Sequence, residues 1–201
     1  GHISNRKMNY LAHLRLSQSD AESMVGNLMG DFRKYLDDAV LPDKVSLGIE
    51  NHLLVDKFTD SHPVILDLKC LFSRRRRRFA GIVIDVTFDY FLIRHWQSFN
   101  DNEFNGFIDQ AHSKITSLSD IMPERMQYVM DYMIRDNWLR SYASLEGTST
   151  ALDRMAGRIR FENNFAGAIE EVKDNYQKLE EGFLEFFPEL VEHVQINTKL
   201  K

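Results

Sequence analysis

The segment 48–63, GIENHLLVDKFTDSHP, contains four side chains that could do chemistry: His52, Asp56, Asp60 and His62. On an α-helix, at about 100° per residue, the first three of them share a narrow stripe whose N-terminal end is apolar. A buried carboxylate is costly unless it is paired, hydrogen-bonded or bound to a cation. The stripe therefore predicts that groups from other segments meet these side chains.

Groups of the same kind occur elsewhere in the first half of the chain, namely His13, Asn27 with Asp31, and Asp85 with Asp89. A mixed set of imidazoles and carboxylates without thiolates suits Mn²⁺, Fe²⁺, Co²⁺ or Zn²⁺ in a site other than a structural zinc site. Taken singly, each such residue is more often a helix cap, a satisfied buried polar group or a surface residue than a ligand. The prediction of a divalent-metal site rests on the convergence of separate segments.

Other catalytic patterns are absent from the sequence. It contains no Gly-rich phosphate loop, no G-x-S-x-G elbow and no H-E-x-x-H motif. No glutamate is followed by a histidine three residues later, as di-iron helical bundles require. Cys70 lies in an apolar segment, so we expect an inert buried thiol instead of a nucleophile.

Five consecutive arginines stand out on a chain whose formal net charge is −5: Arg74, Arg75, Arg76, Arg77 and Arg78. The run spans more than one helical turn, so its side chains cannot all point one way. Two interpretations stay open. The run is either a solvated helix end, where positive charge complements the helix dipole, or a docking site for an anionic partner.

The elements that must position these groups are all predicted to be helices, in one domain over residues 8–191. Asp20 or Ser19 suits the cap of a helix over 21–36, in which Gly26 and Gly30 lie one turn apart. Because glycine costs about 1 kcal/mol in a helix, this pair predicts the close approach of another backbone. The next helix begins near Pro42 and runs to about residue 60.

Further helices are expected from residue 63 to the arginine run and over 82–99, 103–118, 123–144, 148–161 and 164–187. The β-branched start of 82–99 favours a strand, but Asp85, Asp89, Leu92 and Trp96 keep a helical stripe, which favours a helix. Pro188 is expected to interrupt the last helix. Residues 1–7, GHISNRK, resemble a tag and lead, and residues 192–201 are expected to be a polar tail that frays.

Composition limits the class of protein. At 43% hydrophobic and 27% charged residues, the 201-residue chain is typical of a soluble globular protein with a sizeable core. Its negative charge argues against nucleic acid as a partner. A single cysteine fits a reducing compartment, and no apolar run approaches the ~20 residues of a membrane span. We therefore expect a cytoplasmic protein without a membrane partner, and the oligomeric state stays open.

Four blocks together resemble the signature blocks of the acyl carrier protein phosphodiesterases, in the same order and with similar gaps. They are NYLAH (9–13), GNLMGDF (26–32), GIENHLLVDKFTDSHP (48–63) and IDVTFDYFLIRHW (84–96). The resemblance covers most of residues 8–190 and implies a helical fold distantly related to the HD-type metal phosphohydrolases. It implies hydrolysis of the phosphodiester that joins 4′-phosphopantetheine to a serine of holo-acyl carrier protein, with a divalent cation that is typically Mn²⁺.

The resemblance also implies residue roles. Asp31 is expected to be essential to activity, with His13, His52 and Asp56 as the next ligand candidates. Asp60, Asp85 and Asp89 are expected to be ligands or to orient ligands. Metal-assisted hydrolysis, apart from the resemblance, also calls for a group that takes or relays a proton, and Asp60 or His62 is expected to do so. The arginine run would dock the strongly acidic carrier protein.

This chain departs from the family pattern at some positions. It has no adjacent His-Asp pair, Tyr90 follows Asp89 where members can have His, and Leu53 follows His52 where members can have Arg. These departures leave individual ligand assignments open. Two alternatives also stay open: a metal phosphohydrolase acting on a nucleotide or another small phosphate ester, and a non-catalytic helical module that binds a carrier protein.

Overall fold

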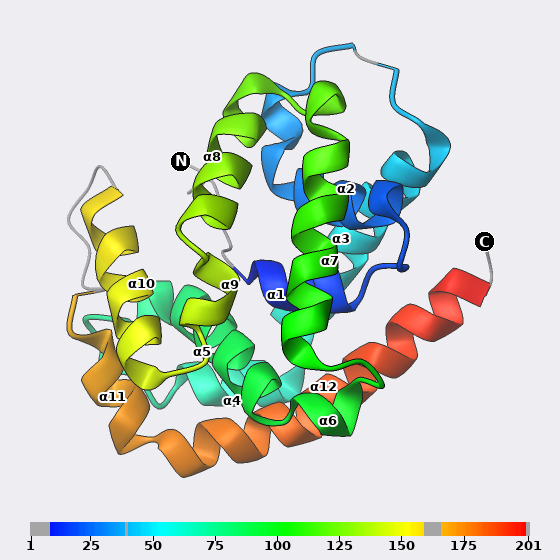
Figure 1. Cartoon of the computed structure of the whole chain (residues 1–201). Coiled ribbons are helices and arrows are strands. Elements are labelled where there is room, and N and C mark those ends of the chain that lie inside the picture. The colour runs from blue at the N-terminus through cyan, green and yellow to red at the C-terminus, as the bar shows by residue number, and fades with distance from the viewer. Residues whose placement is uncertain (1–8, 39, 159–165, 200–201) are drawn as a thin grey trace. The chain divides into compact units, whose positions relative to one another are not determined.

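Helices form nearly all of the regular structure in the computed structural model, which describes residues 9–38, 40–158 and 166–199 (Figure 1). No strand occurs in these ranges, which confirms the predicted all-α class. The expected lead over residues 1–7 lies outside them. The chain divides into two compact units, Gly1–Asp56 with Trp96–Arg140 and Lys57–His95 with Ser141–Lys201. The single domain expected over 8–191 stays a prediction.

The first unit is built around α2 (Ala21–Met29), which packs against α1 (Tyr10–Arg15) and α7 (Phe104–Ser117). Asp20 caps α2, because its carboxylate accepts a hydrogen bond from the Ser23 amide at 3.0 Å, as predicted. The unit continues through η1 (Gly30–Tyr35) and most of α3 (Asp43–Ser61). Its remaining elements are α6 (Trp96–Phe99), η3 (Ser119–Ile121), α8 (Glu124–Arg135) and α9 (Trp138–Ser141).

Glycines let α2 and α3 approach each other closely. A Cβ atom added to Gly48 would lie 2.8 Å from the Gly26 Cα atom, and one added to Gly26 would overlap the Val45 carbonyl. A Cβ atom on Gly30 would overlap the imidazole of His52. The predicted close approach of a backbone is therefore confirmed at Gly26, whereas Gly30 makes room for the side chain of a candidate site residue.

The helix predicted over 21–36 is not one continuous α-helix. The α-helical part ends at Met29, and Gly30–Tyr35 tighten into a 3₁₀ turn. Because a 3₁₀ segment has fewer residues per turn, it changes the direction in which Asp31 points. Asp31 comes directly after the glycine that lies against His52, so the change of helix type occurs at the candidate site.

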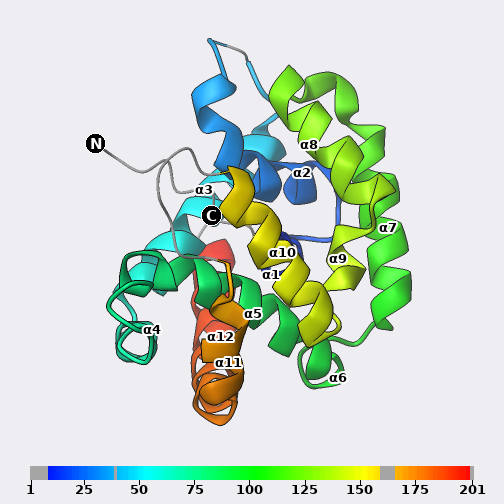
Figure 2. The same ribbon diagram turned by 90° about the vertical axis from the view of Figure 1, so that its left-hand side faces the viewer.

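The second unit contains α4 (Pro63–Lys69), η2 (Arg77–Phe79), α5 (Ala80–Arg94), α10 (Leu145–Arg158), α11 (Ala168–Asp174) and α12 (Tyr176–Lys199). Helices α4 and α5 pack against each other and against α12, and α10 packs against α5 and α11 (Figure 2). Phe88 and Phe91 of α5 contact the ring of Phe183 on α12. The helix predicted over 82–99 is confirmed, although it breaks at His95 between α5 and α6.

Several predicted boundaries are wrong. Helix α12 continues past Pro188 to Lys199, and Leu190 and Val194 are buried, so an apolar face keeps residues 192–199 helical. The helix expected from residue 63 to the arginines ends at Lys69, and Cys70 after it is exposed. The segment 123–144 divides into α8 and α9, and 164–187 divides between α11 and α12, whereas residues 159–165 lie outside the described ranges.

No helix in the described part of the chain combines the length and the apolar character that crossing a membrane requires.

Candidate metal centre

Four of the predicted site residues come together in the first unit, from three stretches of chain. His13 lies on α1, Asp31 in η1, and His52 and Asp56 one turn apart on α3. The His52 Nε2 atom lies 3.2 Å from Asp31 Oδ1 and 3.2 Å from Asp56 Oδ2. The other oxygen of Asp56 lies 3.4 Å from His13 Nε2.

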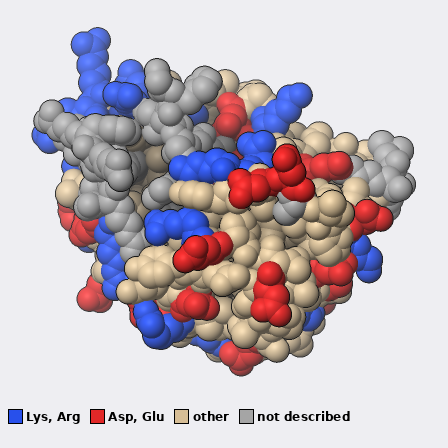
Figure 3. All heavy atoms as spheres, turned by 90° about the horizontal axis from the view of Figure 1, so that it is seen from above, with Lys and Arg blue, Asp and Glu red and all other residues tan. Residues whose placement is uncertain are grey.

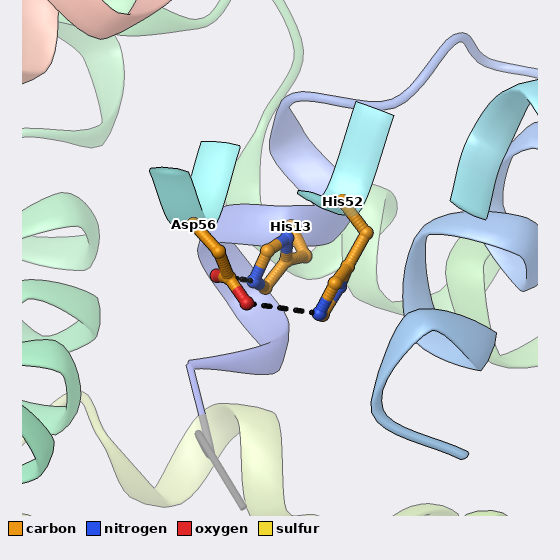
Figure 4. Close-up of side chains that lie close together, drawn as sticks. All are labelled: His13, His52 and Asp56. Carbon is orange, nitrogen blue, oxygen red and sulfur yellow. Dashed lines mark ion pairs between the residues drawn. The ribbon is translucent and has the colours of Figure 1, made fainter. Parts of the chain in front are cut away.

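Figure 4 shows the Asp56 carboxylate facing both imidazoles. The two rings stack with centroids 4.0 Å apart and an interplanar angle of 16°. One ligand atom from each of His13, His52 and Asp56 lies within 4.8 Å of the others. Ligand atoms bound to one ion at about 2.1 Å are separated by roughly 3 to 3.4 Å, and the nitrogen–oxygen distances of 3.2 and 3.4 Å given above suit a divalent cation.

A hydrogen bond from Nδ1 fixes the orientation of the His52 ring. Its Nδ1 atom lies 2.6 Å from the backbone carbonyl oxygen of Asn27. A carbonyl oxygen can only accept, so Nδ1 carries a hydrogen and donates it to Asn27. The Nε2 atom, on the opposite edge of the ring, faces the carboxylates of Asp31 and Asp56. Metal-bound histidines are held in this way, with the second ring nitrogen donating to a carbonyl or carboxylate.

The cluster also contains buried polar atoms that lack hydrogen-bond partners among the described residues. His13 is fully buried, its Nδ1 atom makes no hydrogen bond, and its Nε2 atom has only the 3.4 Å ion pair with Asp56; Asp31 Oδ2 makes no hydrogen bond either. Most buried polar atoms in proteins are hydrogen-bonded, so each exception needs an explanation. A cation bound by these residues would supply one, which is why the side chains present fit a metal.

The pKa values show how strongly the site favours positive charge. Burial lowers the pKa of His13, and the neighbouring His52 lowers it further. Burial alone would also lower the pKa of His52, but the carboxylates of Asp31 and Asp56 outweigh it and raise this pKa to about 10. The two histidines lower the pKa of Asp56 despite its burial. The lowered pKa of Asp56 and the raised pKa of His52 mean that the ionised carboxylate stabilises a positive charge beside it, which here is the proton on His52.

The residues expected to handle protons, Asp60 and His62, lie in the second unit. Asp60 is exposed near the end of α3. His62 caps α4, because its Nδ1 atom accepts a hydrogen bond from the Val64 amide at 3.2 Å. Its Nε2 atom donates to Glu189 Oε2 at 2.6 Å. These contacts give His62 a role in the fold, and proton relay by either residue stays a prediction.

Asp85 and Asp89 are buried on α5, also in the second unit. Their buried stripe agrees with the predicted helix. Their assignment as ligands, or as residues that orient ligands, stays a prediction.

The arginine run forms a turn and the short η2 instead of a helix end. Arg76 is the half-buried member, and its guanidinium pairs with Glu171 of α11 and donates to the Ala166 carbonyl at 2.9 Å. The exposed members are Arg74, Arg75, Arg77 and Arg78, and we name these four the basic turn. On the face drawn in Figure 3, described basic side chains occur next to acidic ones.

Sequence reasoning missed Asn51, which directly precedes His52 on α3. Its amide donates to Asn27 Oδ1 at 2.8 Å and to the Leu16 carbonyl at 3.2 Å. Asn51 falls off the stripe that His52 and Asp56 share, so a search for residues one turn apart does not find it.

A chain whose described residues are helical, with two buried histidines beside two half-buried carboxylates, is a candidate metal-binding protein of the kind found among hydrolases. The family model for acyl carrier protein phosphodiesterase matches residues 8–190, so the chain belongs to this family. The resemblance seen in the four sequence blocks is thereby confirmed, whereas the distant relation to HD-type enzymes stays a prediction.

Relatives named acyl carrier protein phosphodiesterase agree with this assignment over nearly full length. The protein of Serratia proteamaculans is 35% identical over 189 residues, which cover 94% of this chain and 98% of the relative. The protein of Yersinia pestis is 34% identical with the same coverage, and that of Salmonella agona is 31% identical over 92% of this chain and 96% of the relative. No solved structure matches the chain.

Proposed function

We propose that this protein hydrolyses the phosphodiester between 4′-phosphopantetheine and a serine of holo-acyl carrier protein. Water adds to phosphorus, the bond from phosphorus to the serine oxygen breaks, and the serine leaves as its hydroxyl. The products are the apo carrier and free 4′-phosphopantetheine. Membership of the family supports the substrate, and the buried cluster of His13, His52 and Asp56 beside Asp31 is the observation that carries the chemistry.

His13, Asp31, His52 and Asp56 would hold a divalent cation. Such an ion lowers the pKa of a bound water and offsets charge on the phosphoryl oxygens. The mixed set of imidazoles and carboxylates suits Mn²⁺, Fe²⁺, Co²⁺ or Zn²⁺, and the resemblance to the family is the reason for preferring Mn²⁺ among them. Asp31 Oδ2 has no hydrogen-bond donor among the described residues, so it is available to accept a proton or hydrogen bond from a water at the cluster.

The basic turn is proposed to dock the carrier protein. Its four arginines are exposed residues, and the pairing of Arg76 with Glu171 holds the turn to α11. Opposite charge on a partner raises the association rate more than it changes chemistry. We therefore propose two roles for the run: Arg76 holds the turn in place, and the other arginines bind an acidic surface.

We also propose that the protein is cytoplasmic, since its single cysteine, Cys70, is an exposed free thiol of the kind that persists in a reducing compartment.

The test is an intact-mass assay of holo-acyl carrier protein incubated with the Mn²⁺-loaded protein. We expect conversion of holo to apo carrier together with release of 4′-phosphopantetheine, and loss of both after chelation. The same preparation is run against a panel of nucleotides. Turnover of a nucleotide without turnover of the carrier would identify a small-ester phosphohydrolase, and tight binding of the carrier without turnover would identify a non-catalytic module. Either outcome contradicts the proposal.

A further inference from the structure

One side-chain amide links the stretches of chain that supply the candidate ligands. Asn51 on α3 uses both hydrogens of its Nδ2 atom, one for the Asn27 side chain of α2 and one for the Leu16 carbonyl at the end of α1. Carbonyls in the last turn of a helix have no partner within that helix, so the second bond satisfies an otherwise unpaired group. Asn51 thereby joins α3 to both α1 and α2.

Both bonds of Asn51 lead on to a candidate ligand. Asn27 is buried, its own amide donates to the Ser23 carbonyl at 2.9 Å, and its backbone carbonyl accepts the Nδ1 hydrogen of His52. Leu16 follows His13 by three residues and caps the C-terminal end of α1. A shift of α1 or α2 relative to Asn51 would therefore change the position of an imidazole.

We propose that Asn51 is a positioning residue that sets the spacing of His13, His52 and Asp56 and so determines how tightly the cluster binds a divalent cation. This inference rests on the metal site of the proposed function. Asn51 contacts none of these three side chains in the bonds described, and it acts through Asn27 and the end of α1. Its effect is that of an outer partner of a metal ligand, whose loss typically costs about 10- to 100-fold in metal affinity.

An amide suits this position because both of its partners are acceptors. Aspartate has the same shape but only accepts when ionised, so Asn51→Asp would place oxygen against the Asn27 Oδ1 atom and against the Leu16 carbonyl. Alanine would remove both bonds without adding repulsion. The two variants therefore separate loss of the links from active displacement of the helices.

Gln127 provides a matched control in the same unit. Its Nε2 atom likewise donates two hydrogen bonds, here to the backbone carbonyls of Ser119 at 2.9 Å and Met122 at 3.0 Å. Asn51→Ala and Gln127→Ala each remove a partly buried amide that makes two donor bonds. We expect similar losses of stability from the two substitutions, because the lost bonds are similar in number and kind.

The experiment measures Mn²⁺ binding by isothermal titration calorimetry for the full chain and for Asn51→Ala, Asn51→Asp and Gln127→Ala. We expect affinity to fall about 10- to 100-fold for both Asn51 variants. Gln127→Ala should bind Mn²⁺ like the unchanged protein. Equal affinity in all four proteins, or an equal loss in Asn51→Ala and Gln127→Ala, would overturn the inference.

A second measurement needs no metal and covers variants that are too unstable for titration. The NMR shift of the His52 Nδ1 hydrogen in the metal-free protein reports its hydrogen bond to the Asn27 carbonyl. We expect this shift to change in Asn51→Ser, which keeps a small polar side chain in place of the amide. An unchanged shift in that variant would overturn the link from Asn51 to His52. Failure of the unchanged protein to bind metal would instead contradict the proposed function.

Discussion

Replacing Gly30 by alanine should damage the metal centre through packing alone. The added Cβ atom would lie 2.7 Å from the His52 Cβ atom and still closer to its ring. These atoms lie close to the His52 backbone, so the side chain cannot move away from the new methyl group unless α3 shifts or the hydrogen bond from His52 to the Asn27 carbonyl breaks. Overpacking of this kind lowers the unfolding free energy by about 1 to 3 kcal/mol. Displacing the imidazole should in addition weaken metal binding.

Gly106→Ala is the matched control in the same unit. The nearest atom to an added Cβ there is a Glu103 carboxylate oxygen at 3.5 Å, which is ordinary contact. Because Gly106 lies in the first turn of α7, alanine should stabilise the protein by about 0.4 to 1 kcal/mol through the unfolded state. The two substitutions add the same methyl group with opposite expected signs.

The assays are urea unfolding of the metal-free protein and calorimetric titration with Mn²⁺. We expect Gly30→Ala to lower the unfolding free energy and to weaken Mn²⁺ binding by at least about tenfold, which is the lower end for losing the support of a metal ligand. If Gly30→Ala instead matched Gly106→Ala in both stability and Mn²⁺ affinity, the packing of Gly30 against His52 described above would be wrong.

Three further outcomes are expected. Asp31→Asn should abolish release of 4′-phosphopantetheine and leave far-ultraviolet circular dichroism unchanged, whereas exposed Asp131→Asn should keep full activity. The Arg76 guanidinium and the Ser73 amide lower the pKa of Glu171 despite its desolvation, so the native state binds fewer protons there than the unfolded state. This pairing should stabilise the folded protein by about 0.5 to 1 kcal/mol, the range for a solvent-screened pair, in full above the ordinary carboxyl pKa and less as pH falls below it. In urea unfolding, Glu171→Gln should remove this contribution to the difference in unfolding free energy between pH 7 and pH 3. Serine in place of the four arginines of the basic turn should raise KM for holo carrier and flatten its salt dependence at unchanged kcat. A KM unaffected by these substitutions at low salt would contradict docking there.

Residue type and spacing were enough to predict the helices and most of the cluster. His52 and Asp56 one turn apart had to share a face of α3, and Gly26 with Gly30 indicated that a second backbone lay against α2. The sequence could not show which backbone that was, because the partner residue, Gly48, is a single glycine with no second glycine one turn away to mark a helix contact. Only the packed helices identify it.

Two predicted roles depended on contacts that spacing does not contain. His62 was grouped with His52 because it follows closely in sequence, yet Pro63 starts a new helix and leaves His62 as its cap. The arginines looked equivalent as a run. In the structure Arg76 is distinguished by Glu171, which lies 95 residues away and whose position no local pattern reveals.

Asn51 shows why the search for a site should include neighbours that lie off the stripe. Adjacent residues on a helix point about 100° apart, so a residue next to a ligand faces a different neighbour from the ligand itself. Here His52 faces the carboxylates while Asn51 faces α1 and α2, the helices that supply or lead to the other candidate ligands. A polar residue beside a buried histidine is therefore well placed to fix the surroundings of that histidine without entering the site. Comparing Asn51→Ala with Gln127→Ala tests this reasoning directly, because the two differ in what their bonds hold in place.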